Sequence, residues 1–315
     1  MSQSNLASPA FSGAAAWVCA AARRHARAPM LLAVVGMGCT PHVEVLTGIS
    51  YDDRYDITQM DVYRVRSHER RAGILLIHGG GWSEGDRTEM DDYAERLAAS
   101  GYVVASIGYR LGAAGQFPKA VQDCFCALGF FQENAALFGV RPHDVVVGGY
   151  SAGGHLASML GLATDVPELA TDCETPPLHL PAGVINGAGP TDAWQYVDSA
   201  EPEEQLILDF VGQSPAEAPE LYDQVSPVTH VAGRAPPFLQ IYGSRDDIVP
   251  PEQGRILQEA LRAEGHASQL LVIRGAGHFS DPSSKAGHLG VGALLDLPEA
   301  WVVTHDFLDR TVGAP

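Results

Sequence analysis

The 315-residue sequence predicts an α/β domain built on a mostly parallel sheet flanked by helices. Short apolar runs, typical of buried strands, alternate with segments whose apolar residues recur at helical spacing. No repeat of about 20 to 50 residues is present, and no linker rich in Pro, Gly or Ser divides the core. We therefore expect one domain over residues 43–312, with an N-terminal extension over residues 1–42 and a small cap insertion over residues 189–230.

The strands within residues 43–65 are predicted from alternating apolar and polar residues, the later strands from apolar runs, and the helices from spacing and end signals. The run Gly73–Ile77 is continuously apolar, as in a strand buried in a parallel sheet. Gly101 follows one helical pattern as its end signal, and Pro118 stands in the first turn of the next helix. The predicted strands are residues 43–46, 57–65, 73–77, 102–107, 145–147, 182–185, 238–242 and 269–273, and the predicted helices are residues 86–99, 117–138, 155–162, 251–264 and 289–308. The first two strands are expected to form an antiparallel lead-in. Residues 189–230 are acidic, mostly non-periodic and too long for a simple connection.

Composition limits the classes of partner and cofactor. Hydrophobic residues make up 46% and charged residues 18%, enough apolar content for a sizeable core. The formal charge of −18 argues against nucleic acid and anionic membrane surfaces as partners. The five cysteines, at 19, 39, 124, 126 and 173, form neither a disulfide framework nor a zinc pattern. We interpret Cys124 and Cys126 as core or near-core thiols and expect no metal and no organic cofactor.

The N-terminal segment allows two interpretations. Residues 1–38 contain three arginines and no Asp or Glu, and an apolar run over residues 31–38 ends at Cys39. This order resembles a bacterial lipoprotein signal, which would give an extracytoplasmic protein tethered to a membrane through a lipidated Cys39. Gly36 departs from that pattern, where such signals prefer leucine. The alternative is an N-terminal extension on a cytoplasmic protein.

The stretch around Ser151 is the centre of the functional prediction. Residues 149–153 read Gly-Tyr-Ser-Ala-Gly, between an apolar strand and a helical segment. This context is the one a nucleophile elbow needs, because the turn leaves no room for bulky residues two positions either side of the serine. A glycine-rich turn with a chance serine is the alternative. Downstream, Asp246 follows one strand and His278 the next. Parallel sheets place their sites at this carboxyl edge.

Four motifs in this order resemble a known family. They are His-Gly-Gly-Gly-Trp at 78–82, Gly-Tyr-Ser-Ala-Gly-Gly-His-Leu-Ala at 149–157, Ser-Arg-Asp-Asp-Ile-Val-Pro at 244–250 and Gly-Ala-Gly-His at 275–278. Together they resemble the α/β-hydrolases, above all the esterases that join the hormone-sensitive-lipase-like enzymes to the feruloyl/acetyl-xylan (BD-FAE type) carboxylesterases. The likeness covers residues 44–310 and implies the α/β-hydrolase fold.

The resemblance implies catalytic roles for individual residues. Ser151 would be the nucleophile, His278 the general base and acid, and Asp246 the group that orients His278. Asp246 is preferred because the family places its acid three residues before the Val-Pro pair, and Asp247 is the alternative. The oxyanion hole would use the N–H groups of Gly80, Gly81 and Ala152.

Three further side chains near these motifs have open roles. Trp82 is expected either beside the acyl site, as a substrate-binding residue, or in the core. His78 is interpreted as a brace of its loop that does not touch substrate. His155 is expected to be a core or capping residue rather than a catalytic one.

The predicted function is that of a serine carboxylic-ester hydrolase acting through an acyl-enzyme on a small-molecule ester. Trp82 beside the glycine loop, with an acidic cap, favours short acyl groups. An arylformamidase-type amide hydrolase is the alternative, because such enzymes share a similar glycine loop and triad. A non-catalytic binding module is disfavoured, since every triad position is filled. The natural substrate and the oligomeric state are not encoded in a recognisable motif.

Overall fold

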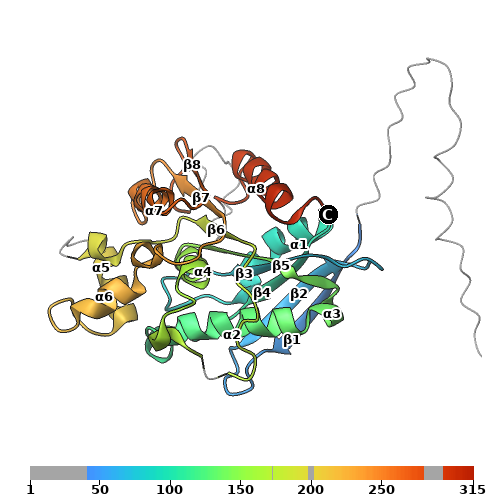
Figure 1. Ribbon diagram of the computed structural model, residues 1–315, viewed down its shortest axis with the longest axis horizontal. Coiled ribbons are helices and arrows are strands. Elements are labelled where there is room, and N and C mark those ends of the chain that lie inside the picture. Colours follow the sequence, from blue (N-terminus) through green and yellow to red (C-terminus); the bar gives the residue numbers. More distant parts are fainter. Residues whose placement is uncertain (1–40, 172, 198–201, 280–293) are drawn as a thin grey trace, which may run out of the picture. The chain divides into compact units, whose positions relative to one another are not determined.

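The computed structural model describes residues 41–171, 173–197, 202–279 and 294–315. Within these ranges the chain forms an eight-stranded sheet in the order β1-β2-β4-β3-β5-β6-β7-β8 (Figure 1). The strands are β1 (Val43–Ser50), β2 (Gln59–Val65), β3 (Arg71–Ile77), β4 (Val103–Ile107), β5 (Val140–Tyr150), β6 (Gly183–Gly187), β7 (Phe238–Gly243) and β8 (Ser268–Ile273). The predicted lipoprotein-like signal and Cys39 lie outside the described residues.

The pairing follows the predicted pattern of an antiparallel lead-in and a parallel body. β1 pairs antiparallel with β2, and β2 antiparallel with β4. Every other pair is parallel, from β3 with β4 and β5 to β7 with β8. The carboxyl ends of β3, β5, β7 and β8 therefore meet at one edge of the sheet, which is where the predicted site residues follow their strands.

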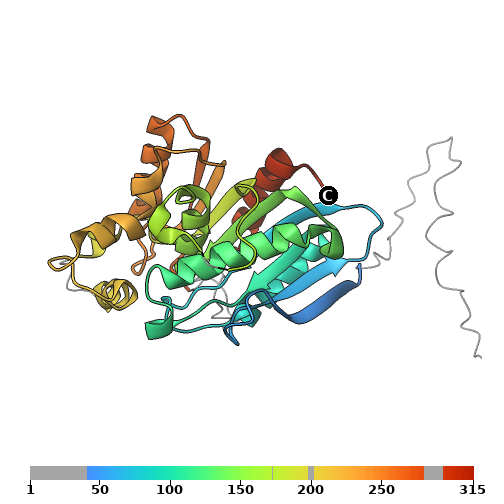
Figure 2. The same cartoon turned by 60° about the horizontal axis from the view of Figure 1, so that its bottom comes forward.

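Helices cover both faces of the sheet (Figures 1 and 2). The α-helices are α1 (Asp91–Ala99), α2 (Lys119–Glu133), α3 (Ala135–Phe138), α4 (Ala152–Leu162), α5 (Pro202–Val211), α6 (Pro219–Val225), α7 (Pro251–Ala263) and α8 (Pro298–Val312). The 3-10 helices are Arg87–Met90, Gly112–Ala114, Pro167–Leu169, Ala193–Tyr196 and Pro227–His230. Because the predicted helix 117–138 breaks at Asn134, it forms two helices, and Gly139 then reverses the chain with φ 82°. Part of the predicted helix 289–308 lies outside the described residues.

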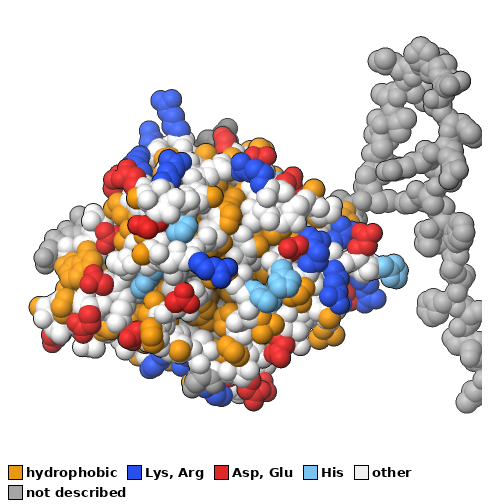
Figure 3. Space-filling model, viewed as in Figure 1, with side chains coloured by type: hydrophobic (Ala, Val, Ile, Leu, Met, Phe, Trp, Pro, Cys, Tyr) orange, Lys and Arg blue, Asp and Glu red, His pale blue; other side chains and the backbone are white. Residues whose placement is uncertain are grey.

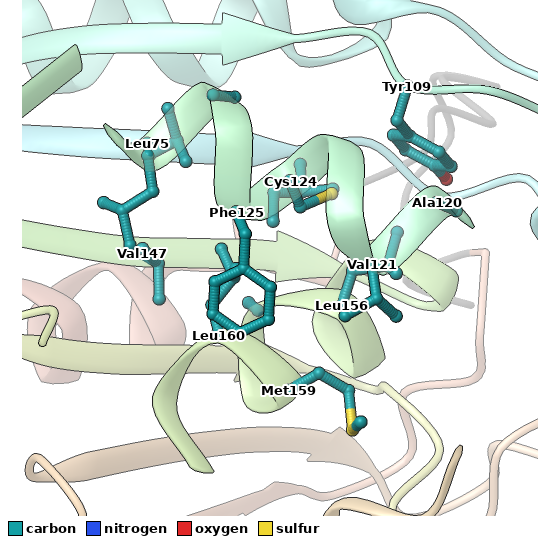
Figure 4. Packing of buried hydrophobic residues seen from close by; sticks show 14 of the residues in the cluster. Leu75, Tyr109, Ala120, Val121, Cys124, Phe125, Val147, Leu156, Met159 and Leu160 are labelled. Atoms are coloured by element: carbon teal, nitrogen blue, oxygen red, sulfur yellow. The ribbon is translucent and has the colours of Figure 1, made fainter. Parts of the chain in front are cut away.

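Successive strand residues contribute alternately to two hydrophobic cores, one on each face of the sheet. Leu75 and Val147 pack in the core that includes α2 and α4, whereas Ile74 and Val146 pack in the core that includes α1 and α8. Successive side chains of a strand point to opposite faces, so one continuous apolar run supplies both cores. Figure 4 shows the first core, where side chains of α2 meet Leu156, Met159 and Leu160 of α4.

Two expectations from the sequence are wrong. The cap insertion 189–230 is not mostly non-periodic, because it holds α5 and α6. Cys126 is not a free thiol, because it forms a disulfide with Cys173 across a Cα–Cα distance of 6.0 Å. The partners are 47 residues apart in sequence, and only the path of the loop after α4 brings them together. Cys124 is buried and free, as expected.

Some features can be stated only for the described residues. No helix in those ranges has the length and apolar character that crossing a membrane requires. Across the same ranges, no three side chains of His, Cys, Asp or Glu gather as a metal ion would need.

Candidate active site

Ser151 stands at the sharp turn between β5 and α4. Its backbone has φ 54° and ψ −122°, a conformation that residues with a side chain rarely adopt. A Cβ atom on Gly149 would overlap the carbonyl of Gly153, and a Cβ atom on Gly153 would overlap the carbonyl of Ile77. Both glycines are therefore required by close backbone packing, which is the reason the sequence suggested for them.

A chain of hydrogen bonds joins Ser151 to the loops after β7 and β8. The Oγ atom of Ser151 lies 2.9 Å from Nε2 of His278, and Nδ1 of His278 lies 2.7 Å from Oδ2 of Asp246. A carboxylate only accepts hydrogen bonds, so Nδ1 of His278 carries a proton and donates a hydrogen bond to Asp246. Nε2 is then free to accept a hydrogen bond from the serine hydroxyl. His278 and Asp246 are buried, whereas Ser151 is half-buried. This arrangement can remove a proton from a serine that a substrate can reach.

The structure distinguishes the two neighbouring acids at the end of β7. Asp246 is 5% exposed, and its Oδ1 atom accepts hydrogen bonds from the N–H groups of Ile248 at 3.1 Å and Val249 at 2.8 Å. Its other oxygen faces His278. Asp247 is exposed to solvent. The carboxylate that bonds to His278 is thus Asp246, whereas the side chain of Asp247 faces solvent.

Close packing of the two loops holds Asp246 and His278 in register. A Cβ atom on Gly243 would overlap the carbonyl of Ala276, and the N–H of Arg245 donates to that same carbonyl at 2.8 Å. From the other side, the buried hydroxyl of Tyr150 donates to the carbonyl of His278. The loop that carries His278 is therefore bonded to Tyr150, the last residue of β5, which directly precedes Ser151.

The glycine loop after β3 presents backbone donors near the serine. Gly80 and Gly81 have φ values of 98° and 56°. Within the described ranges, no hydrogen bond uses the N–H of either glycine. Ala152 is the first residue of α4, so its N–H has no acceptor within the helix and lies at the positive end of the helix dipole. Gly81 and Ala152 line the same small cavity as Ser151, whereas Gly80 does not line it.

Trp82 is buried next to the glycine loop and lines the cavity beside Ser151. Its Nε1 donates to Nδ1 of His155 at 3.2 Å, and Nε2 of His155 donates to the carbonyl of Val225 at 2.7 Å. Both ring nitrogens of His155 are therefore engaged, and burial lowers its pKa to about 4. A neutral, fully bonded ring that links Trp82 to the end of α6 fits a core residue.

The chain is similar in sequence to known esterases. The family model described as BD-FAE matches residues 60–261. This chain belongs to the BD-FAE family. Esterase LipC of Mycobacterium tuberculosis is 33% identical over 232 residues, covering 70% of this chain and 57% of LipC. Esterase LipQ of the same organism is 28% identical over 206 residues, covering 63% of this chain and 48% of LipQ. The chain thus spans about half the length of these relatives.

Solved structures place this BD-FAE chain among α/β-hydrolases. A thermophilic esterase from the Planctomycetes species Thermogutta terrifontis aligns with a TM-score of 0.65 and 25% identity, covering 86% of this chain and 93% of the other. A truncated carbohydrate esterase from gut microbiota aligns with a TM-score of 0.70 and 22% identity, covering 87% and 98%. The fold is the α/β-hydrolase fold, a mostly parallel sheet flanked by helices, as the sequence predicted.

Sequence reasoning missed the part of this site that comes from the cap. The cavity beside Ser151 is closed by Tyr196, Leu206 and Ile207, which all belong to the insertion 189–230. The signal was available in the spacing of α5, where Leu206 and Phe210 stand one helical turn apart on one face. Phe210 stacks on Trp82 with ring centroids 4.5 Å apart and planes inclined by 7°.

His78 lies under the glycine loop and is fully buried. Its Nδ1 donates to the carbonyl of Gly79 at 2.8 Å, and its ring stacks on Tyr109 with centroids 4.4 Å apart. The hydroxyl of Tyr109 donates to the carbonyls of His78 and Gly79 at 3.1 and 3.2 Å. Burial lowers the pKa of His78 to about 4, which keeps the ring neutral. His78 therefore braces the loop from below, as interpreted from the sequence.

Proposed function

We propose that residues 43–312 form a serine carboxylic-ester hydrolase that works through an acyl-enzyme. The observation that carries the proposal is the hydrogen-bonded chain from Ser151 through His278 to Asp246, at 2.9 and 2.7 Å, on a strained turn. Strain at a half-buried serine beside a buried base is typical of an activated nucleophile. The esterase names of the relatives support the same reaction class.

Acylation begins when the Oγ of Ser151 attacks the ester carbonyl carbon. Nε2 of His278 takes the hydroxyl proton, and Asp246 stabilises the imidazolium that forms. The carbonyl oxygen becomes an oxyanion, which the N–H groups of Gly80, Gly81 and Ala152 would bind. When the intermediate collapses, the bond to the leaving oxygen breaks, His278 returns the proton to that oxygen, and the alcohol departs.

Deacylation repeats these steps with water. His278 takes a proton from a water molecule while the water oxygen attacks the acyl carbon, and the same N–H groups hold the second oxyanion. Collapse releases the carboxylic acid, and His278 gives its proton back to Ser151. Every proton is moved by Nε2 of one histidine, which is why its orientation by Asp246 matters for both halves.

We propose a preference for short acyl groups, from acetyl to butyryl. The cavity beside Ser151 has a volume of about 30 Å³, and Trp82 forms one of its walls. That volume is about two to three times the roughly 10 to 15 Å³ that one water molecule needs, so the cavity favours a short acyl group over a long chain. Slower turnover of p-nitrophenyl butyrate than of triolein would contradict this preference.

Labelling tests the proposed function directly. A fluorophosphonate probe should modify the protein stoichiometrically, and peptide mapping should place the adduct on Ser151. Short p-nitrophenyl esters and N-formylkynurenine are then assayed side by side, because the arylformamidase alternative predicts faster cleavage of the formamide. Absence of labelling on folded protein, or a dominant formamidase activity, would refute the ester hydrolase.

We also infer an extracytoplasmic location with a membrane tether at Cys39. The Cys126–Cys173 disulfide supports this location independently of the N-terminal sequence, since such bonds persist mainly in oxidising compartments. Mass spectrometry of the native protein tests it. A lipidated N-terminus at Cys39 is expected, and an intact, unmodified Met1 would refute the tether.

A further inference from the structure

The small cavity beside Ser151 lies on the acyl side of the reacting ester. Its walls include Ser151, Gly81 and Ala152, which hold the attacking oxygen and two proposed oxyanion donors, but not His278. The leaving oxygen must face Nε2 of His278, because that atom returns its proton. The alcohol therefore departs on the histidine side, and the part of the substrate that enters the cavity is the acyl group.

Helix α5 closes this cavity from above. A Cβ atom built on Gly81 would lie 3.2 Å from Cδ2 of Leu206, so the leucine side chain sits directly over the glycine. One helical turn later, Phe210 stacks on Trp82 at 4.5 Å. Two neighbouring residues of the glycine loop are thus covered by two residues at i and i+4 on one helix face.

The same helix is fastened to the body of the domain near its carboxyl end. The carbonyl of Phe210 accepts from the N–H of Phe117 at 2.8 Å, and the carbonyl of Asp209 accepts from the side-chain amide of Gln116 at 3.1 Å. These hydrogen bonds and the stacking of Phe210 on Trp82 fix the position of α5 relative to the glycine loop. A longer acyl chain must therefore displace Leu206 itself or lift the helix.

Leu206 lines the cavity and is also partly exposed to solvent. Its side chain faces Gly81 on one side, yet the residue is 36% exposed. Over α5 and α6, the surface in Figure 3 shows hydrophobic side chains among acidic ones. Ile207, by contrast, is 4% exposed and packs inward. Replacing Leu206 by a smaller residue would therefore extend the cavity through the cap to the surface, without removing a buried core side chain.

We propose that Leu206 sets the upper limit on acyl length in this enzyme. The proposal rests on the proposed esterase function and names the residue that gives it short-chain specificity. A leucine at this position leaves room for the short acyl groups proposed above, from acetyl to butyryl. A smaller residue would let a medium-length chain pass above Gly81 and leave through the surface, while a larger one would narrow the choice to acetyl.

The test compares acyl-length profiles of the wild type, Leu206→Ala and Leu206→Phe with p-nitrophenyl acetate, butyrate and octanoate. One methylene group removed from water is worth roughly fourfold in kcat/KM. Burial of about two such groups should raise the octanoate-to-acetate ratio of Leu206→Ala roughly 15-fold over wild type. Leu206→Phe should lower the butyrate-to-acetate ratio. Thermal melting confirms that both variants are folded.

A control variant removes another exposed leucine, away from the cavity. Leu137 in α3 is 70% exposed and precedes β5, whose other end carries the elbow. Leu137→Ala should keep the wild-type profile. An unchanged octanoate-to-acetate ratio in folded, fluorophosphonate-labelled Leu206→Ala would overturn the inference and leave the esterase function standing. Failure of wild type to be labelled or to cleave any ester would refute the function, and the inference with it.

Discussion

The carboxyl edge of the sheet and the cap insertion build one cavity by different means. At the sheet edge, Gly149 and Gly153 are packed so tightly against backbone that no side chain fits. In the cap, α5 reaches the site through side chains, with Phe210 on Trp82 and Leu206 over Gly81. The first region has no freedom of sequence at its critical positions, whereas the second can exchange one side chain for another.

Under the proposed function, this difference places the chemical steps and the selection of the acyl group in separate parts of the chain. Proton transfer needs donor and acceptor within hydrogen-bond reach, which only rigid backbone can maintain. Selection of the acyl group by length needs a cavity of limited depth, and any apolar side chain of suitable size can set that depth. We therefore expect large losses of kcat from changes at the sheet edge, and smaller changes of stability, KM or substrate preference from changes in the cap.

The largest expected effect concerns the nucleophile. Ser151→Ala should reduce kcat for p-nitrophenyl acetate by about 10⁴-fold or more, because the variant lacks the hydroxyl proposed to form the acyl-enzyme. Alanine can adopt the same backbone as serine, so the melting temperature should change little. Steady-state kinetics on freshly purified variant measures the loss. Retention of a tenth of the wild-type kcat, with contamination excluded, would show that Ser151 is not the nucleophile.

The next effect separates the two acids. Asp246→Asn should lower kcat by roughly 10²- to 10⁴-fold, because an amide can orient His278 but favours the wrong tautomer. Asp247→Asn, its matched control, should change kcat by less than about tenfold, since its charge is exposed and screened. Both variants are assayed across pH 6 to 9. Greater damage from Asp247→Asn would move the acid by one residue.

The third effect concerns His155, which bridges the two regions. Its pKa is about 4 in the folded protein, below its ordinary 6.5, because of burial. As the pH falls below about 6.5, His155 becomes protonated in the unfolded chain but stays neutral in the folded protein. The free energy of unfolding therefore decreases until the pH reaches about 4, where the folded protein binds the proton as well. Between pH 7 and 4.5 the wild type should lose about 2 kcal/mol more than His155→Gln. Urea unfolding measures this difference.

The glutamine variant is chosen because its amide can donate to Val225 and accept from Trp82, as the histidine does. Comparison with this variant also cancels the titration of His78 and of the carboxylates, which both proteins share. Parallel pH profiles for the two proteins would contradict a buried neutral histidine at this position.

The smallest effect concerns the stack that seats α5. Phe210→Ala removes the contact with Trp82, and an aromatic pair contributes about 0.5 to 1.5 kcal/mol beyond its buried area. We expect KM for p-nitrophenyl acetate to rise by up to roughly tenfold, with a smaller change in kcat. Phe130→Ala, which removes a half-buried phenylalanine of α2 that lies 6.4 Å from Phe138, serves as control. A kcat loss as large as that of Asp246→Asn would erase the distinction between the two regions.

Sequence alone was sufficient wherever a function needs neighbouring residues or a fixed chain order. The elbow around Ser151 is readable because its glycines are imposed by local geometry, and Asp246 and His278 each follow a strand of a parallel sheet. Apolar runs located the parallel strands, because a strand buried on both faces needs continuous apolar residues, and alternating apolar and polar residues located β1 and β2. The structure changes the bounds of these strands, lengthening β3 and β5 and shortening β2 and β4.

Only the tertiary structure decided contacts between segments distant in sequence. The pairing of Cys126 with Cys173, the seat of Phe210 on Trp82 and the place of Leu206 over Gly81 each depend on where a loop or helix returns to the domain. No local pattern encodes that return, because the helical spacing of α5 shows which residues share a face and not what the face meets. The sequence therefore determined the elbow and its candidate partners, and the return of the chain through the cap decided the shape of the cavity beside Ser151.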